Sequence, residues 1–130
     1  MLLVEDNDLN AEIAATIMED EGAYVSIAGD GAQAVEAFAA NPAETFDVIL
    51  MDVAMPKMDG LAATRAIRAL DRPDAASIPI IAMTGNAFQE DVRECLEAGM
   101  NAHIAKPIDA AKAERVIAKA MGRRENSVQQ

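Results

Sequence analysis

Aromatic side chains and positive charge are scarce in this sequence. It has no Trp, one Tyr and three Phe, and 11 Lys and Arg stand against 22 Asp and Glu, which leaves a net charge of −11 at pH 7. Such a charge repels phosphate backbones and anionic lipids, and so few aromatic rings make a poor platform for stacking bases. We therefore expect no direct nucleic-acid binding and no direct membrane contact.

Cysteine pairs and long apolar runs are also lacking. Cys95 is the only cysteine, so no internal disulfide can form, and no pair of Cys or His residues has metal-ligand spacing. Both facts suit a reducing, cytoplasmic compartment. Residues 1–4 are apolar but run directly into acidic residues, unlike a signal peptide. No uninterrupted apolar run in the sequence approaches the ~18 residues of a membrane helix.

Short apolar runs alternate along the chain with segments of helical periodicity. The runs lie at residues 2–4, 24–27, 48–51, 80–83 and 102–104. Because they are apolar at successive positions, they predict strands covered on both faces, as in a parallel sheet between two layers of helices. The alternation predicts an α/β fold, a flavodoxin-like doubly wound (βα)5 unit whose five-stranded parallel sheet has the strand order 2-1-3-4-5.

The helical segments have recognisable ends. Gly22 and Gly99 follow the first and fourth segments as C′ residues, whereas Asp59 and Asp109 precede the third and fifth as N-caps. These four positions bound helices that connect the strands.

One domain accounts for nearly the whole chain. The first helix is predicted from the spacing of Leu9, Ile13 and Ile17, and neither a linker nor an internal repeat interrupts the elements that follow. We expect a single domain over residues 1–121, followed by a polar tail or linker at residues 122–130.

Polar side chains come at the ends of four of the apolar runs. Glu5 and Asp6 follow the first run, Asp52 the third, Thr84 the fourth and Lys106 the fifth. The carboxyl ends of parallel strands point the same way, so these side chains should meet in one cleft. Three carboxylates at such short range need a cation between them. Oxygen ligands without His or Cys suit Mg²⁺, which is often completed by phosphate oxygens.

Each of these residues also has a simpler interpretation. The acidic residues 5–8 could only place favourable charge at a helix N-terminus, and Asp52 could be a turn former. Thr84 could be an ordinary strand-end residue, and Lys106 a solvated side chain. All four would then have to be coincidences at equivalent strand ends, so the set favours a functional site.

The segments at residues 3–7, 51–60, 83–84 and 105–107 resemble the receiver domains of bacterial response regulators, and the resemblance extends over residues 1–121. It implies that Asp52 is the phosphoacceptor, that Thr84 binds a phosphoryl oxygen and that Lys106 pairs with the phosphate. It also implies a Mg²⁺ site made by Glu5, Asp6, Asp52 and the main-chain carbonyl of Ala54.

The resemblance further implies a partner and a mechanism. The donor would be a phosphohistidine on a histidine kinase or a histidine phosphotransfer protein, and the domain would catalyse its own phosphorylation and dephosphorylation. Phosphoryl transfer needs in-line placement and charge neutralisation, with little covalent chemistry from the protein. Phosphorylation would then alter the face made by the fourth helix, fifth strand and fifth helix, which is also where a homodimer would form.

Some positions depart from the usual pattern of such domains. Thr84 and His103 occupy the two switch positions, but the second usually carries Tyr or Phe. The imidazole ring of a histidine differs from these rings because it is polar and can change its charge near neutral pH. Gly85 replaces a common Ala and lowers the steric demand on its loop. Ala54 and Asn86 flank the expected phosphate site, where the family controls access of the hydrolytic water.

Several alternatives remain open at this point. The chain is either a single-domain response regulator or the receiver of a hybrid sensor histidine kinase, and the position of Met1 and the run at residues 63–68 favour the hybrid. A degenerate receiver would act only as a protein-interaction module. A haloacid-dehalogenase-like phosphatase would need an Asp where Ala54 stands, and a flavodoxin would need a Ser, Thr and Gly loop in place of the acidic residues 5–8.

Overall fold

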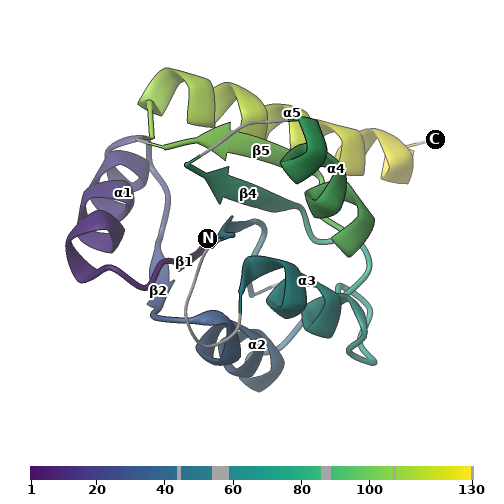
Figure 1. The fold of residues 1–130 in the computed structure, drawn as a ribbon. Coiled ribbons are helices and arrows are strands. Elements are labelled where there is room, and N and C mark those ends of the chain that lie inside the picture. Colours follow the sequence, from purple (N-terminus) through teal and green to yellow (C-terminus); the bar gives the residue numbers. More distant parts are fainter. Residues whose placement is uncertain (44, 54–58, 86–88, 107, 130) are drawn as a thin grey trace.

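The computed structural model describes residues 1–43, 45–53, 59–85, 89–106 and 108–129. Strands and helices alternate along the described chain (Figure 1). The strands are β1 (Leu2–Val4), β2 (Ser26–Ala28), β3 (Ile49–Asp52), β4 (Ile80–Thr84) and β5 (Ala102–Ala105). The helices are α1 (Asp8–Asp20), α2 (Gly31–Ala40), α3 (Gly60–Arg68), α4 (Gln89–Ala98) and α5 (Ala110–Gln129).

The five strands form one parallel sheet in the order β2-β1-β3-β4-β5, which confirms the predicted fold and strand order. In this register Asp52 lies beside Met83, and Thr84 lies beside Ala105. The last residues of β3 and β4 therefore lie at the carboxyl-terminal end of the sheet, where the loop after β5 also begins. This arrangement positions the site.

Two apolar layers cover the sheet, with α1 and α5 on one face and α2, α3 and α4 on the other (Figure 1). Side chains alternate between the two faces along each central strand. Leu2 therefore packs into the layer of α2, α3 and α4, and Leu3 packs into the layer of α1 and α5. All residues of β1, β3 and β4 are buried, as their continuous apolar runs predict.

The second strand differs from its prediction. It covers Ser26–Ala28 and not residues 24–27, and the side chain of Tyr24 is 92% exposed. Strand β2 lies at the edge of the sheet and pairs only with β1 in the described sheet. Because an edge strand is covered less completely, Ile27 is also exposed, and the apolar run alone could not fix the strand boundaries.

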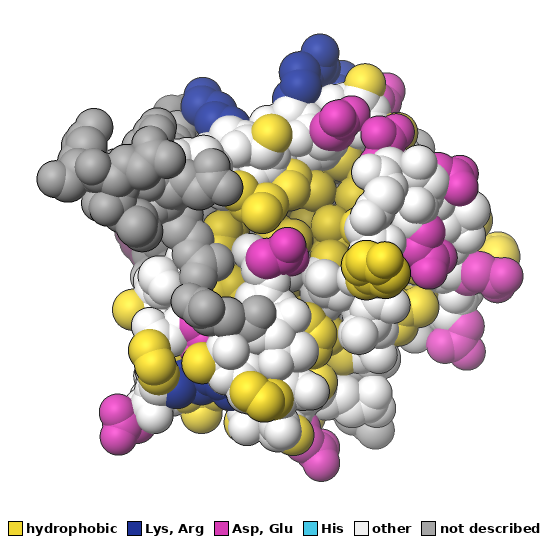
Figure 2. Space-filling model, turned by 180° about the vertical axis from the view of Figure 1, so that it is seen from behind, with side chains coloured by type: hydrophobic (Ala, Val, Ile, Leu, Met, Phe, Trp, Pro, Cys, Tyr) yellow, Lys and Arg dark blue, Asp and Glu magenta, His cyan; other side chains and the backbone are white. Residues whose placement is uncertain are grey.

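Helix α1 turns three alanines and Met18 to the core and leaves Leu9 and Ile13 exposed. Its buried residues are Ala11, Ala14, Ala15 and Met18. Leu9 is 64% exposed and Ile13 51% exposed, although their spacing predicted the helix correctly. Figure 2 shows the molecule from behind, where apolar side chains are open in a hollow and acidic side chains lie around it.

The predicted helix ends are confirmed. Gly22 and Gly99 have positive φ angles of 96° and 111°, which favour glycine. Asp59 Oδ1 accepts a hydrogen bond from the main-chain nitrogen of Ala62 at 2.8 Å, and Asp109 Oδ1 accepts one from Lys112 at 3.1 Å.

Helix α5 (Ala110–Gln129) continues through residues 122–129, which their polar composition predicted to be a tail or linker. Residues 123–129 contain no proline, and several of them are good helix formers. Gly122 does not adopt a positive φ, so it does not end the helix. No helix in the described part of the chain is both long and apolar enough to cross a membrane.

A partly buried arginine at the end of α3 joins three segments. The guanidinium of Arg68 donates to the main-chain oxygens of Gly99 at 2.8 and 3.0 Å and of Ala75 at 3.0 Å, and to Oδ1 of Asn101 at 2.8 Å. Oδ1 of Asn101 also accepts from the main-chain nitrogen of Ile80 at 2.9 Å. Burial lowers the pKa of Arg68 below its ordinary value, while the carbonyl oxygens satisfy its donors.

Candidate functional site

The polar residues singled out in the sequence lie together at the carboxyl ends of the central strands. Glu5 and Asp6 come directly after β1, Asp52 ends β3, Thr84 ends β4 and Lys106 follows β5. They line one cleft of about 490 Å³. Glu5 and Asp52 are each only 3% exposed, and Thr84 is buried, whereas Asp6 is exposed. The expected gathering of these side chains is present in the structure.

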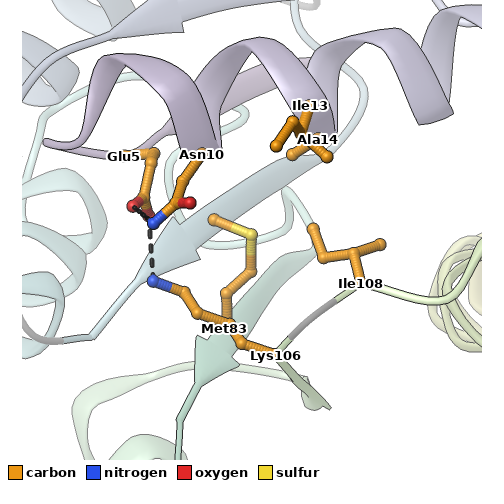
Figure 3. A pocket seen from close by; sticks show the side chains of 7 residues that line it. All are labelled: Glu5, Asn10, Ile13, Ala14, Met83, Lys106 and Ile108. Carbon is orange, nitrogen blue, oxygen red and sulfur yellow. Dashed lines mark hydrogen bonds and ion pairs between the residues drawn. The ribbon is translucent and has the colours of Figure 1, made fainter.

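A single ammonium group bridges two buried carboxylates. Lys106 Nζ lies 3.0 Å from Glu5 Oε2 and 3.0 Å from Asp52 Oδ2. The other oxygen of Glu5, Oε1, accepts a hydrogen bond of 3.4 Å from Nδ2 of Asn10, in the first turn of α1. Figure 3 shows the side chains of Asn10 and Lys106 converging on Glu5 from α1 and from the loop after β5.

These contacts shift the ionisation of all three charged groups. Burial and the neighbouring Glu5 raise the pKa of Asp52 to about 6, against the opposing effect of Lys106. Burial would also raise the pKa of Glu5, but its hydrogen bonds and the charge of Lys106 outweigh burial and lower it. For Lys106, burial lowers the pKa, and the two carboxylates reverse that effect and raise it. One positive charge thus serves two carboxylates.

The donor set fits a hard divalent cation. Glu5, Asp6 and Asp52 each offer one carboxylate oxygen, and these oxygens lie within 4.8 Å of one another. Such a cluster of carboxylates, lacking His and Cys, suits Mg²⁺. The fourth expected ligand, the carbonyl of Ala54, lies outside the described residues.

Thr84 adds an unused hydrogen-bonding group to the cleft. Its Oγ1 is buried and has no hydrogen-bond partner within the described structure. Leaving a buried hydroxyl unpaired costs about 1–3 kcal/mol. Functional clefts are where such groups are found, because a ligand oxygen can pair with them. The cleft therefore offers carboxylates for a cation and a hydroxyl and an ammonium for an anion.

Helix α3 approaches the end of β3 very closely. Asp59 caps the helix, and the main-chain nitrogen of Gly60 donates to the carbonyl of Val53 at 3.1 Å. A Cβ atom at Gly60 would collide with the main-chain oxygen of Asp52 and crowd Val53. Only glycine fits at this position without movement of the strand.

The second switch position is outside the cleft. His103 lies on the edge strand β5 beside Ala82, and its side chain is exposed. Asn86, expected near the phosphate site, and Pro107, which follows the cleft lysine, lie outside the described residues. The roles of Asn10 and Arg68 were not anticipated from the sequence, because no motif marks a side chain that bonds to a distant partner.

Comparison with known proteins decides the family. The model of the family described as "Response regulator receiver domain" matches residues 1–118. The chain is a receiver domain. The receiver domain of the sensor histidine kinase PA1611 of Pseudomonas aeruginosa PAO1 is 40% identical, with a TM-score of 0.81 over 93% of this chain and 95% of that one. That structure has a magnesium ion coordinated in its active-site cleft.

Two relatives of this receiver domain are much longer proteins, a sensor protein and a probable histidine kinase. Sensor protein GacS of Pseudomonas syringae pv. syringae is 40% identical over 123 residues, and Probable histidine kinase 1 of Oryza sativa subsp. indica is 35% identical over 138 residues. These matches cover 94% and 84% of the receiver domain but only 13% and 14% of the two relatives.

Proposed function

We propose that this receiver domain takes a phosphoryl group from a phosphohistidine partner onto Asp52 in a Mg²⁺-dependent reaction. The partner would be a histidine kinase or a histidine phosphotransfer protein. The observation that carries the proposal is the position of Asp52, a buried carboxylate with a raised pKa that shares its cleft with two further carboxylates and with Lys106. The magnesium ion in the PA1611 receiver domain supports the choice of metal.

The residues of the cleft divide the work of phosphoryl transfer. A carboxylate oxygen of Asp52 forms the new bond to phosphorus while the nitrogen–phosphorus bond of the donor breaks and imidazole leaves. Glu5, Asp6 and Asp52 would hold Mg²⁺, which supplies positive charge to the phosphoryl oxygens when bound. Lys106 lies close enough to Asp52 to pair with the phosphoryl group that forms there. Burial of Asp52 restricts water around the product.

Phosphorylation of Asp52 would then change an interaction surface. The unpaired hydroxyl of Thr84 would bond to a phosphoryl oxygen, and His103 would respond on the neighbouring strand. Strand β5 and helix α4 would then present an altered face, on which Leu96 and His103 are exposed. Such a switch is a population shift between two arrangements. Replacing His103 with Ala should alter the spectral response of this face to beryllofluoride and Mg²⁺, and an unchanged response would exclude His103 from the switch.

We further propose that the chain is the receiver of a cytoplasmic hybrid sensor kinase. The sensor and histidine kinases among its relatives support this, since the chain matches only 13–14% of their length. The complete reading frame of the source gene would test it. A frame that encodes no kinase module would favour a single-domain response regulator.

The experiment that tests the phosphoacceptor is labelling by acetyl phosphate in the presence of Mg²⁺. The wild type should gain one acid-labile phosphoryl group, and Asp52→Ala should gain none. Asp71→Ala removes an exposed carboxylate outside the cleft and should label like the wild type. Label persisting in Asp52→Ala would contradict the assignment, and a wild type without label would favour the alternative of a module for protein interaction alone.

A further inference from the structure

Two side chains of different chemistry hold opposite oxygens of Glu5. Lys106 Nζ donates to Oε2 at 3.0 Å, and Asn10 Nδ2 donates to Oε1 at 3.4 Å (Figure 3). Glu5 itself is buried, so its orientation depends on such partners. The proposed metal site uses Glu5, and the direction of this carboxylate therefore matters to metal affinity.

Lys106 cannot keep its hydrogen bond to Glu5 both before and after phosphorylation or metal binding. Its ammonium is shared with Asp52 at 3.0 Å, and in the proposed function it turns to the phosphoryl group. A bound divalent cation would also repel it from the carboxylates. The long side chain of a lysine can make such a movement at little cost.

Asn10 has the opposite properties. Its amide is neutral, so it does not compete with a cation for the site. It lies in the first turn of α1, where its main-chain nitrogen donates to the side chain of the N-cap Asn7 at 2.9 Å, which fixes its backbone. Asn10 also borders two clefts, the acidic one of about 490 Å³ and a mainly apolar one of about 280 Å³ lined by Ile13 and Ile108.

We infer that Asn10 is a positioning residue for the metal site, which keeps Glu5 directed at the cation when Lys106 turns to the phosphoryl group. The inference rests on the proposed function, because it assumes that Glu5 helps to hold Mg²⁺. Partners that orient a metal ligand are worth about 10- to 100-fold in affinity. A single exposed amide at 3.4 Å should lie at the lower end of that range.

The first test is the dissociation constant for Mg²⁺, measured by calorimetry on the full chain. Asn10→Ala should weaken binding about tenfold, and Asn10→Gln, which keeps an amide donor, should recover part of the loss. Glu12→Gln changes an exposed side chain of α1 outside both clefts and should bind like the wild type. Alanine favours helices, so a merely structural role for Asn10 would change thermal stability and leave Mg²⁺ affinity alone.

The second test is a double-mutant cycle with Lys106→Met. Without the ammonium, Glu5 loses one of the two side chains that hold its opposite oxygens before the metal binds, so Asn10→Ala should weaken Mg²⁺ binding by a larger factor in the Lys106→Met background than in the wild type. Equal factors in both backgrounds would overturn the inference, as would an unchanged dissociation constant in Asn10→Ala. A wild type that does not bind Mg²⁺ would overturn the proposed function and the inference together. A wild type that binds Mg²⁺, with an Asn10→Ala variant that binds it equally well, would overturn the inference alone.

Discussion

The ammonium nitrogen of Lys106 lies 3.0 Å from Oδ2 of Asp52. The proposed phosphoacceptor is therefore paired with a cation before any phosphoryl group arrives. The same nitrogen also contacts Glu5, so one positive charge is divided between two buried carboxylates. The metal-free cleft keeps an excess of negative charge, and this excess governs how the protein responds to pH, to metal and to mutation.

The first prediction concerns stability in the absence of metal. The pKa of Asp52 is raised to about 6, above its ordinary 3.8, so its contribution to folding is fully present below pH 3.8 and is lost as the pH rises through 6. With EDTA present, Asp52→Asn should therefore raise the melting temperature at pH 7 to 8 by several degrees. The gain should vanish near pH 4 in thermal melts. A variant that melts below the wild type at pH 8 would show that the lost contact to Lys106 outweighs the relief of repulsion.

The second prediction separates metal ligation from general electrostatics. Asp6→Ala should weaken Mg²⁺ binding by at least about tenfold, because it removes one of the three oxygens that cluster within 4.8 Å. Asp8→Ala removes the same charge nearby on an exposed residue outside the cleft, and calorimetry should find only a small loss. Equal losses in the two variants would mean that Asp6 acts through its charge alone.

The third prediction uses two buried threonines that differ in pairing. Thr84 Oγ1 has no partner in the described structure, whereas Thr64 Oγ1 donates to the main-chain oxygen of Gly60 at 2.7 Å. Thr64→Ala should lower the free energy of unfolding by about 1 kcal/mol in urea titrations, and Thr84→Ala should lower it less. Thr84→Ala should in turn lose more of the spectral response to beryllofluoride and Mg²⁺. The opposite ranking in either measurement would contradict the proposed role of Thr84.

The fourth prediction concerns Lys106 after phosphorylation. Lys106→Ala should reduce the spectral response of β5 to phosphorylation more than it reduces the labelling rate with acetyl phosphate, since Mg²⁺ would carry much of the charge neutralisation. Nuclear magnetic resonance shifts of the β5 amides, followed before and after labelling, make the comparison. A full shift pattern in the variant would show that the lysine does not transmit the signal.

The fifth prediction compares two glycines near the cleft. A Cβ at Gly60 would collide with the main-chain oxygen of Asp52, whereas a Cβ at Gly85 would meet no atom of the described residues within 4 Å. Gly60→Ala should cost about 1–3 kcal/mol, as overpacking typically does, and should slow labelling by displacing Asp52. Gly85→Ala should leave stability within about 0.5 kcal/mol of the wild type in urea unfolding. Similar stability of the two variants would mean that β3 yields easily at this point.

The sequence predicted the strand ends better than the helix faces. Strands β1, β3 and β4 are buried on both faces, so each appears as a continuous apolar run, and the polar residue at the end of that run marks the site. The edge strand β2 lacks that cover, and its predicted bounds included the exposed Tyr24. In α1 the spacing of Leu9 and Ile13 predicted the helix, but packing against the sheet selected the alanines.

The positions of Glu5, Asp52 and Lys106 in the site could be predicted because each lies at the end of a strand that the pattern locates, or directly after it. Asn10 could not, since its contact depends on where α1 lies above the sheet and on the orientation of one amide. Local sequence carries no trace of contacts of that kind.

The partly buried guanidinium of Arg68 has a consequence for how sequences of this type can diverge. Its donors are matched to the carbonyls of Gly99 and Ala75 and to the side chain of Asn101, and a Cβ at Gly99 would press on its aliphatic stem. A lysine has a compact charge and cannot reach all these acceptors at once. Positions 68 and 101 should therefore change together among relatives. Position 75, which contributes only its backbone oxygen, should vary independently of them, and position 99 should stay glycine because its φ of 111° favours glycine in any case.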